Sequence, residues 1–215
     1  MDNEIAQEVS KILLKIKAVF LRPLEPFTWA SGIQSPIYCD NRLILAHPEE
    51  RNKIEDSLAK MIKKEFPDVE VLMGTATAGI PHAAIVSEIL KLPMGYVRAG
   101  SKDHGRRNQI EGAAVSGKKV VVIEDLISTA GSSVEVANIL REANAEVLGV
   151  ASIFTYNMQK GFDRFEEANL KNVSLSNFDI LVNVALEENY INKQEVTMLH
   201  KFRNMPQDPG WQICF

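Results

Sequence analysis

The segment from Lys118 to Ser133, KKVVVIEDLISTAGSS, constrains the fold more than any other part of the sequence. Its β-branched run, Val120 to Ile123, predicts a short strand buried on both faces of a parallel sheet. Glu124 and Asp125 follow where this strand is expected to end. The small, hydroxyl-rich run Ser128 to Ser133 then precedes an amphipathic stretch that predicts a helix. Strand, loop and helix in this order are typical of an α/β protein.

The run Ser128 to Ser133 has the composition of a phosphate-binding loop. Hydroxyls, a glycine and unpaired backbone N–H groups at a helix N-terminus bind anions. Glu124 and Asp125 can accept hydrogen bonds from sugar hydroxyls, so the segment predicts a phosphoribosyl pocket. The alternative is a solvated acidic pair before an ordinary capped helix. The sequence has no G-x-G-x-x-G after a strand and no G-x-x-x-x-G-K-[ST], which argues against a dinucleotide enzyme or a P-loop nucleotidase.

Length and composition suit one soluble α/β domain over residues 1–215. With 46% hydrophobic residues the chain can bury a substantial core, and its net charge of −4 argues against a general nucleic-acid or membrane-surface binder. Cys39 and Cys214 lie far apart, without metal-ligand spacing, and are expected to be free thiols in a reducing cytosol. We expect no signal peptide, and no apolar run reaches the roughly 18 residues of a membrane span. A cytoplasmic location follows as an expectation.

The apolar patterns predict alternating strands and helices from residue 69 onward. Expected helices cover residues 4–20, 48–66, 80–90, the stretch after 133, 179–190 and 193–202. Expected strands cover residues 69–73, 94–98, 120–123 and 146–154, with a short edge strand at 173–175. This order predicts a mostly parallel, doubly wound sheet with ligands at the carboxyl ends of its strands. We expect residues 1–67 to form N-terminal helices and a hood, 68–178 the core, and 179–215 C-terminal helices.

Three further segments have chemistry of interest. Gly74–Gly79, between a strand and a helix, suits a second phosphate group or a plain structural turn. Arg98–Arg107 is cation-rich and follows a strand, so it suits a loop closing over a polyanion or a solvated face. Phe27–Gly32 and Ser35–Arg42 mix aromatic and backbone-shaping residues, and suit the grip of a flat polar ring or simple core packing.

Together these segments resemble the orotate phosphoribosyltransferases, in the form found in Gram-positive bacteria. The similar motifs are FTWASG, SPIYCDNR, GTATAGIPHA, KDHG, NQIEG and VVIEDLISTAGS. The resemblance implies a type I phosphoribosyltransferase fold, an α/β core with a hood. It also implies transfer of 5-phosphoribosyl from phosphoribosyl pyrophosphate (PRPP) to N1 of orotate, in the de novo synthesis of pyrimidines. Members of the family use Mg²⁺ and form homodimers in which the mobile loop of one subunit completes the site of its neighbour.

The resemblance also implies roles for individual residues. The residues implied at the ribose 5-phosphate of PRPP are Glu124, Asp125, Ser128, Thr129, Ala130, Gly131 and Ser132. Those implied in a pyrophosphate loop are Thr75, Ala76 and Thr77. Those implied at the leaving pyrophosphate are Arg98, Lys102 and His104. Arg98, Lys102, His104 and Asp125 are the implied catalytic residues, Lys102 and His104 being supplied by the partner subunit. For orotate they are Ser31, Tyr38, Cys39, Thr129 and Tyr156. No residue is expected to hold the metal directly, because PRPP holds Mg²⁺ in the main.

The chain departs from the family pattern at several positions. Ala78, Ala30 and Tyr156 replace two lysines and an arginine of some relatives, which is consistent with variation between subfamilies. Ala99 and Gly100 stand where many relatives have a second loop lysine. One preorganised cation at a leaving group is worth about 3 kcal/mol of transition-state stabilisation, so we expect a functional but slower enzyme, with Arg106 or Arg107 compensating in part.

This expectation has a direct kinetic test. Lysine installed at Ala99 or Gly100 should raise kcat, and an unchanged or lower kcat would contradict the hypothesis. Two readings stay open beside the main one. The first is a phosphoribosyltransferase for another base, such as a purine. The second is a regulatory protein that keeps the PRPP fold, although neither a basic face nor an appended helix-turn-helix is visible.

The sequence also sets a geometric condition on the acidic pair. Successive strand residues face opposite sides. Glu124 and Asp125 are therefore expected to share one ribose only if the strand has already ended before them.

Overall fold

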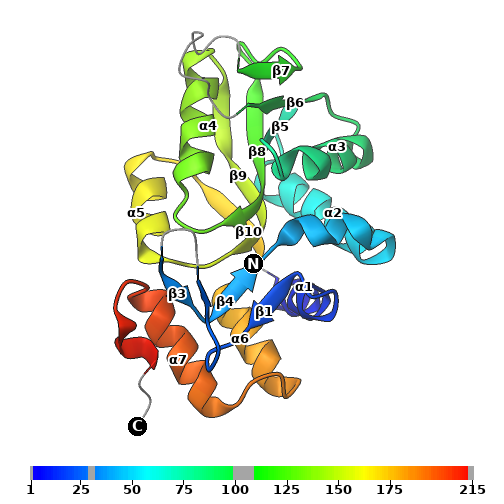
Figure 1. The fold of residues 1–215 in the computed structure, drawn as a ribbon. Helices are drawn as coiled ribbons and strands as arrows, with labels where there is room; N and C mark the ends of the chain where they lie inside the picture. Colours follow the sequence, from blue (N-terminus) through cyan, green and yellow to red (C-terminus); the bar gives the residue numbers. More distant parts are fainter. Residues whose placement is uncertain (1, 29–31, 99–108, 213–215) are drawn as a thin grey trace.

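A six-stranded sheet forms the centre of the protein (Figure 1). The computed structural model describes residues 2–28, 32–98 and 109–212. The strands of the sheet are β5 (Val71–Thr75), β6 (Met94–Val97), β7 (Ile110–Gly112), β8 (Lys119–Ile127), β9 (Glu146–Thr155) and β10 (Asn172–Asn177). Their spatial order is β10-β9-β8-β5-β6-β7, and only the β6–β7 pair is antiparallel. The mostly parallel sheet expected from the sequence is therefore confirmed, with β10 as an edge strand.

Helices cover both faces of this sheet. On one face pack α1 (Asn3–Lys15), α2 (Pro48–Glu65) and α3 (Gly79–Leu90), against inward residues such as Leu72, Val121 and Ile123. On the other face pack α4 (Gly131–Glu142) and α5 (Gln159–Glu167), against Val120 and Val122 among others. The unbroken β-branched run of β8 is explained by this arrangement, because alternate residues enter two different cores.

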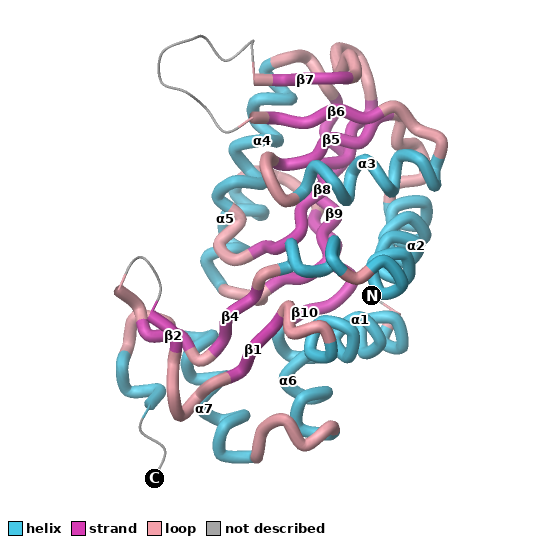
Figure 2. The backbone as a smooth tube through the Cα atoms, turned by 45° about the vertical axis from the view of Figure 1, so that its right-hand side comes forward, coloured by secondary structure: helices cyan, strands magenta, loops and turns pink. Residues whose placement is uncertain are grey.

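The hood comprises residues 19–46 and contains two small antiparallel sheets. One pairs β1 (Val19–Leu21) with β4 (Ile37–Cys39), and the other pairs β2 (Phe27–Thr28) with β3 (Gln34–Ser35). A short 3₁₀ helix, η1 (Asn41–Ala46), follows. Beside the hood lie α6 (Phe178–Glu187), α7 (Lys193–Asn204) and η3 (Pro209–Gln212), in both views of the chain (Figures 1 and 2). Segments from the two ends of the chain therefore lie side by side below the core.

Several element boundaries differ from those expected. The first helix ends at Lys15 rather than near residue 20, because Lys17 takes a left-handed φ of 57° and the chain then enters β1. Gly74 and Thr75 belong to β5 instead of a loop. Strand β7, which contains Ile110 and Glu111, was not predicted. Helix α5 was not predicted.

The most consequential difference lies in β8. This strand extends to Ile127, so Glu124 and Asp125 lie inside it and not beyond its end. The reason is unequal pairing on its two sides: the ladder to β5 stops at Gly74↔Ile123, whereas the ladder to β9 continues to Ile127↔Thr155.

Candidate functional site

The carboxyl ends of β5, β8 and β9 meet the hood, and the predicted site residues gather there. Asn41 of η1 ties the two parts together: it is fully buried, and its side-chain amide donates to the backbone carbonyl of Asp125 over 2.7 Å. An amide hydrogen bond to a backbone carbonyl fixes the position of a strand without using its side chain. The carboxylate of Asp125 therefore remains available to a ligand.

Glu124 points toward β5 and the start of α4. Its carboxylate accepts a hydrogen bond from the Thr75 hydroxyl (2.6 Å), and longer ones from the hydroxyls of Ser133 (3.2 Å) and Ser132 (3.4 Å). Burial, with the Asp125 charge next to it, raises the pKa of Glu124 to about 7, although the Thr75 hydrogen bond opposes this rise. The carboxyl group is thus poised to gain or lose a proton near neutral pH.

Asp125 lies near the hood. Its charge helps to raise the pKa values of the Cys39 thiol and the Arg42 guanidinium, so these groups are its electrostatic neighbours. The strand continues past both acids, so the expected condition for sharing one ribose, a strand that has already ended, is not met. The two carboxylates nevertheless lie close together, because the charge of Asp125 and a side-chain hydrogen bond with it both help to raise the pKa of Glu124. Their joint role at a ribose stays a prediction.

Three of the residues predicted to bind the base lie together beside Asp125. The Cys39 thiol is 3.2 Å from the Asn41 side-chain oxygen, and burial is the main cause of its raised pKa. Tyr156 is 4% exposed, receives a backbone hydrogen bond from Cys39, and has a pKa raised chiefly by burial. Tyr38 is 40% exposed, with its ring centroid 5.5 Å from that of Phe27. An exposed aromatic face beside buried polar atoms suits a flat polar ring. Ser31 lies outside the described residues.

The predicted phosphate loop connects β8 to α4. Ala130 has a left-handed φ of 58°, and α4 begins at the next residue, Gly131. Ala130 has no side-chain oxygen to cap the helix, so the first N–H groups of α4 face the loop without a side-chain partner from that position. Such N–H groups at a helix N-terminus suit a phosphate. Ser128 and Thr129 complete the loop, whereas the Ser132 hydroxyl points to Glu124.

Arg164 of α5 is a site residue that sequence reasoning missed. Its Nη1 donates to the backbone oxygen of Thr129 (2.8 Å) and to the Thr129 hydroxyl (3.0 Å). A Cβ added at Gly131 would lie 2.9 Å from the same nitrogen, so the guanidinium lies directly over the loop. In the sequence, Arg164 was visible only as a cation in a segment where no helix was predicted, which is a weak signal for a site residue.

The predicted pyrophosphate loop follows β5. Thr75 ends the strand, the Ala76 amide donates to the Val97 carbonyl (3.2 Å), and the Ala76–Thr77 peptide bond is cis. Gly79 then opens α3 against β8, where an added Cβ would lie 2.3 Å from the Ile123 carbonyl oxygen. Only glycine fits this approach, which holds the loop close to Glu124.

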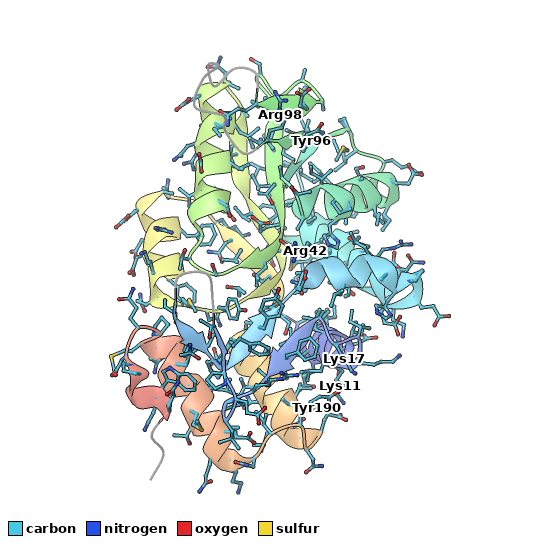
Figure 3. All side chains as sticks on the ribbon, viewed as in Figure 1. Lys11, Lys17, Arg42, Tyr96, Arg98 and Tyr190 are labelled. Atoms are coloured by element: carbon cyan, nitrogen blue, oxygen red, sulfur yellow. The ribbon has the colours of Figure 1, made fainter. Side chains whose placement is uncertain are left out.

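Arg98 directly follows β6, at the same carboxyl edge of the sheet as Thr75. Val97 pairs with Thr75 and accepts from the Ala76 amide, so the backbone of Arg98 adjoins the predicted pyrophosphate loop of its own subunit. Its guanidinium forms a salt bridge of 3.4 Å with Glu111. Figure 3 shows Arg98 and Tyr96 well apart from Arg42, which lies beside the hood. Lys102 and His104, predicted to act with it, lie outside the described residues.

Metal ligands and membrane spans were also sought in the described part of the chain. No group of three or more His, Cys, Asp or Glu side chains there is arranged to hold a metal ion. In the same residues, no helix combines the length and apolarity required to cross a bilayer.

Comparison with known proteins gives consistent results. The family model described as "Phosphoribosyl transferase domain" matches residues 42–189. The orotate phosphoribosyltransferase of Listeria innocua is 57% identical over 203 residues, which are 94% of this chain and 97% of the relative. That of Enterococcus faecalis is 53% identical over 208 residues, which are 97% and 99% of the two chains.

Solved structures share the fold at much lower identity. The orotate phosphoribosyltransferase of Aeropyrum pernix superposes with a TM-score of 0.72 at 24% identity, covering 86% of this chain and 99% of that one. That of Francisella tularensis gives a TM-score of 0.71 at 23% identity, covering 90% and 96%. The sheet and its flanking helices are thus arranged as in known proteins.

Proposed function

Because the chain belongs to the orotate phosphoribosyltransferase family and has its type I fold, we propose that it transfers 5-phosphoribosyl from PRPP to N1 of orotate. The products are orotidine 5′-monophosphate and pyrophosphate, and the step serves de novo pyrimidine synthesis. One observation carries the proposal: the part of β8 that holds Glu124 and Asp125 lies between the loop at the start of α4 and the residues Tyr38, Cys39 and Tyr156.

The geometry supports a division of the substrates along β8. The loop Ser128–Ser132 suits the 5-phosphate through helix N–H groups. Asp125 is placed to accept hydrogen bonds from a ribose hydroxyl on the hood side. Tyr38 offers a half-exposed ring on which the pyrimidine can stack, beside polar atoms of Cys39. Each substrate part then has its own element.

The reaction itself makes modest demands on the protein. Deprotonated orotate N1 bonds to C1 of the ribose while the C1–O bond to pyrophosphate breaks, through an oxocarbenium-like state. The carboxylates of Glu124 and Asp125 face a sugar that gains positive charge, which their own negative charge stabilises. Loop cations, of which Lys102 and His104 are predicted, would stabilise the departing pyrophosphate. No covalent nucleophile is required.

A Mg²⁺ requirement is part of the proposal. Mg²⁺ commonly binds through one or two carboxylates, substrate phosphates and water, rather than a cage made by the protein alone. The donors around the site fit that mode, because Glu124 and Asp125 supply carboxylates without forming a larger ligand cluster among the described residues. When bound with PRPP, Mg²⁺ would neutralise charge on the pyrophosphate. Asp125, which is only half-buried, is the better candidate to contact it.

We further propose a cytoplasmic homodimer with shared sites. In such a dimer Lys102 and His104, from the cationic segment after β6, would serve the neighbouring subunit. Arg98, which adjoins the Ala76–Thr77 loop, would serve its own subunit.

A spectrophotometric assay tests the function. Purified protein is mixed with orotate, PRPP and Mg²⁺, and the loss of orotate absorbance is followed. We expect turnover that depends on all three and falls strongly in Asp125→Asn. Parallel reactions contain adenine or hypoxanthine in place of orotate. Consumption of a purine without consumption of orotate would overturn the assignment and favour the purine alternative, and PRPP binding without any turnover would favour the regulatory one.

A further inference from the structure

A cavity lies along the outer edge of β10, apart from the candidate site. Its volume is about 510 Å³, within the range of small-molecule sites. We call it the β10 groove. Its lining residues come from the N-terminal end of α1, from α2, from the end of β9, from α5 and from β10: Asp2, Ile5, Ser57, Lys60, Met61, Lys64, Glu65, Thr155, Asn157, Phe162, Asn172, Val173, Ser174, Leu175 and Asn177. None of them is a residue predicted to bind PRPP or orotate.

The walls of the β10 groove are largely apolar and include an exposed aromatic ring. Ile5, Met61 and Leu175 line it, and Phe162 of α5 is 47% exposed. Phe165, three residues further along the helix, is buried in the core, whereas Phe162 lies in the lining of the groove. The exposed ring of Phe162 is available to a flat ligand.

The positive charges of the β10 groove are less compensated than its negative ones. Lys60 and Lys64 are one turn apart on α2, and neither is in a salt bridge with a described residue. Of the two acids in the lining, Glu65 is paired with Lys171 at 2.9 Å, and Asp2 caps α1 by accepting from the Glu4 amide at 3.1 Å. The groove thus offers an aromatic wall and two ammonium groups.

We propose that the β10 groove binds a small organic anion with a flat aromatic body, and that its occupancy alters the candidate active site. The ring would lie against Phe162 and Met61, and the anionic group would lie near Lys60 and Lys64. This goes beyond the proposed transferase activity, which makes no use of these residues.

Two covalent paths connect the β10 groove to the candidate active site. Thr155 and Asn157 line the groove, while Tyr156 between them turns the other way and contacts Cys39 of the hood. Helix α5 forms the second path. Phe162 of this helix lines the groove. Its neighbour Gly161 packs closely on the phosphate loop, because a Cβ added there would lie only 3.1 Å from the Ser128 carbonyl oxygen. Arg164 of the same helix donates a hydrogen bond to the Thr129 carbonyl. A ligand that shifts or stiffens α5 would therefore act on the phosphate loop.

The binding test uses 1-anilinonaphthalene-8-sulfonate, a fluorescent aromatic sulfonate with the required chemistry. Full-length protein should bind one equivalent saturably. Phe162→Ser and the double variant Lys60→Gln/Lys64→Gln should each raise its Kd by about tenfold or more. The matched controls are Met205→Ala, an equally exposed apolar residue elsewhere, and Lys53→Gln on the same helix. Both should bind like the wild type, and far-UV circular dichroism confirms that every variant is folded.

The coupling test measures amide hydrogen exchange of residues 125–131 with and without the saturating probe. We expect exchange in this segment to slow by about threefold in the wild type and to stay unchanged in Phe162→Ser. Unchanged affinity in the groove variants, or equal loss in the controls, would overturn the binding site. Unchanged exchange at saturation would overturn its action on the active site. Neither readout requires turnover, so failure here is distinguishable from failure of the proposed transferase function.

Discussion

Burial changes the ionisation of one carboxyl group in the site, that of Glu124. This residue is 5% exposed among hydroxyl groups, and its pKa rises from 4.5 to about 7 because burial penalises its charge. The neighbouring Asp125 is half-buried, and its charge adds to that rise. The electrostatics of the site can therefore be tested by single substitutions.

Glu124→Gln should remove a pH dependence of stability. A carboxyl group with a raised pKa in the folded state favours folding fully below its unfolded pKa of 4.5, and this contribution is lost as pH rises through about 7. The wild-type free energy of unfolding should therefore fall between pH 5 and pH 8, by up to about 3 kcal/mol from this group. Urea unfolding at several pH values measures the fall, which should be largely absent in Glu124→Gln.

Glu135→Gln is the matched control, because Glu135 is exposed on α4. Its unfolding profile should follow that of the wild type across the same pH range. A Glu124→Gln profile parallel to the wild type would show that Glu124 is ionised in the folded protein well below pH 7.

Arg164→Lys should weaken PRPP binding while leaving the fold intact. Lysine keeps the charge but cannot make the paired contacts from one guanidinium to the Thr129 carbonyl and hydroxyl. Hydrogen bonds to charged groups are worth about 1.5–3 kcal/mol, so we expect the PRPP Kd to rise by about ten- to a hundredfold by calorimetry. Arg141→Lys is the control, because Arg141 also donates to loop carbonyls, those of Ala168 and Asn169, but away from the phosphate loop. Equal PRPP affinity in both variants would exclude a positioning role for Arg164.

Between elements, one buried polar contact joins α2 to α3. The His82 Nδ1 and Glu55 Oε1 atoms lie 2.5 Å apart with both side chains fully buried, and burial raises the pKa of Glu55. Their outer atoms, His82 Nε2 and Glu55 Oε2, have no hydrogen-bond partner in the described structure. Among the described residues, His82 and Glu55 therefore each have the other as their side-chain hydrogen-bond partner, and their outer atoms have none. Because α3 begins at the predicted pyrophosphate loop, this contact also fixes the helix that supports the loop.

His82→Leu should destabilise the protein by about 3 kcal/mol or more, since it leaves the Glu55 carboxyl buried without its partner. The double variant His82→Leu/Glu55→Met should recover most of that loss, because an apolar pair of similar volume leaves nothing unsatisfied. Urea unfolding of both variants measures the difference. Glu88→Gln, which breaks the exposed Lys91–Glu88 pair on α3, should change stability little. Additive losses in the double variant would show that the two residues are not coupled.

Local patterns predicted most elements, and the failures have local causes. β-branched runs and helical periodicity identified the strands and helices of the sheet because those segments bury residues at a regular spacing. Helix α5 escaped because it is only nine residues long and mostly polar, and the only residues it buries are Gly161 and Phe165. The true end of β8 was invisible because pairing to β9, a partner distant in sequence, extends the strand past its apolar run.

Only the part of the candidate site that is local in sequence could be predicted. Glu124, Asp125 and the phosphate loop lie on one continuous segment, so their chemistry is visible in the sequence. Arg164 reaches that loop only through folding, and the buried Asn41 amide finds Asp125 across 84 positions. Contacts of this kind leave no local signature. The roles predicted for Tyr38, Cys39 and Tyr156 at the base come from the resemblance to a family, because the residues of 35–42 alone suit either ring binding or core packing.

For the whole molecule, the largest question is how subunits complete one another. Under the proposed function, each subunit would provide Arg98 to its own site, beside the Ala76–Thr77 loop, and a neighbouring subunit would provide Lys102 and His104. Such a dimer makes a clear prediction for mixtures of inactive variants.

Lys102→Ala and Asp125→Asn should each be nearly inactive, yet a mixture should regain activity after subunit exchange. Half of the dimers would be hybrids with one intact site, which gives about a quarter of the wild-type rate. Steady-state assay of the equilibrated mixture measures this. Mixing Asp125→Asn with Glu124→Gln is the control, because both changes affect the same half of every site and no intact site can form. Equal rates in the two mixtures would exclude shared sites.

The one-sided ladder of β8 also bears on how such a protein can change its substrate. Beyond Ile123 the strand is held by β9 alone, so one side chain faces the start of α4 and the next faces the hood. Under the proposed function, recognition of the sugar phosphate and recognition of the base would be built on different elements, which this part of β8 joins. Substitutions in the hood would then alter the preferred base while the loop before α4 keeps its geometry. A lineage of such proteins would thus acquire new acceptors without rebuilding the donor half of its site.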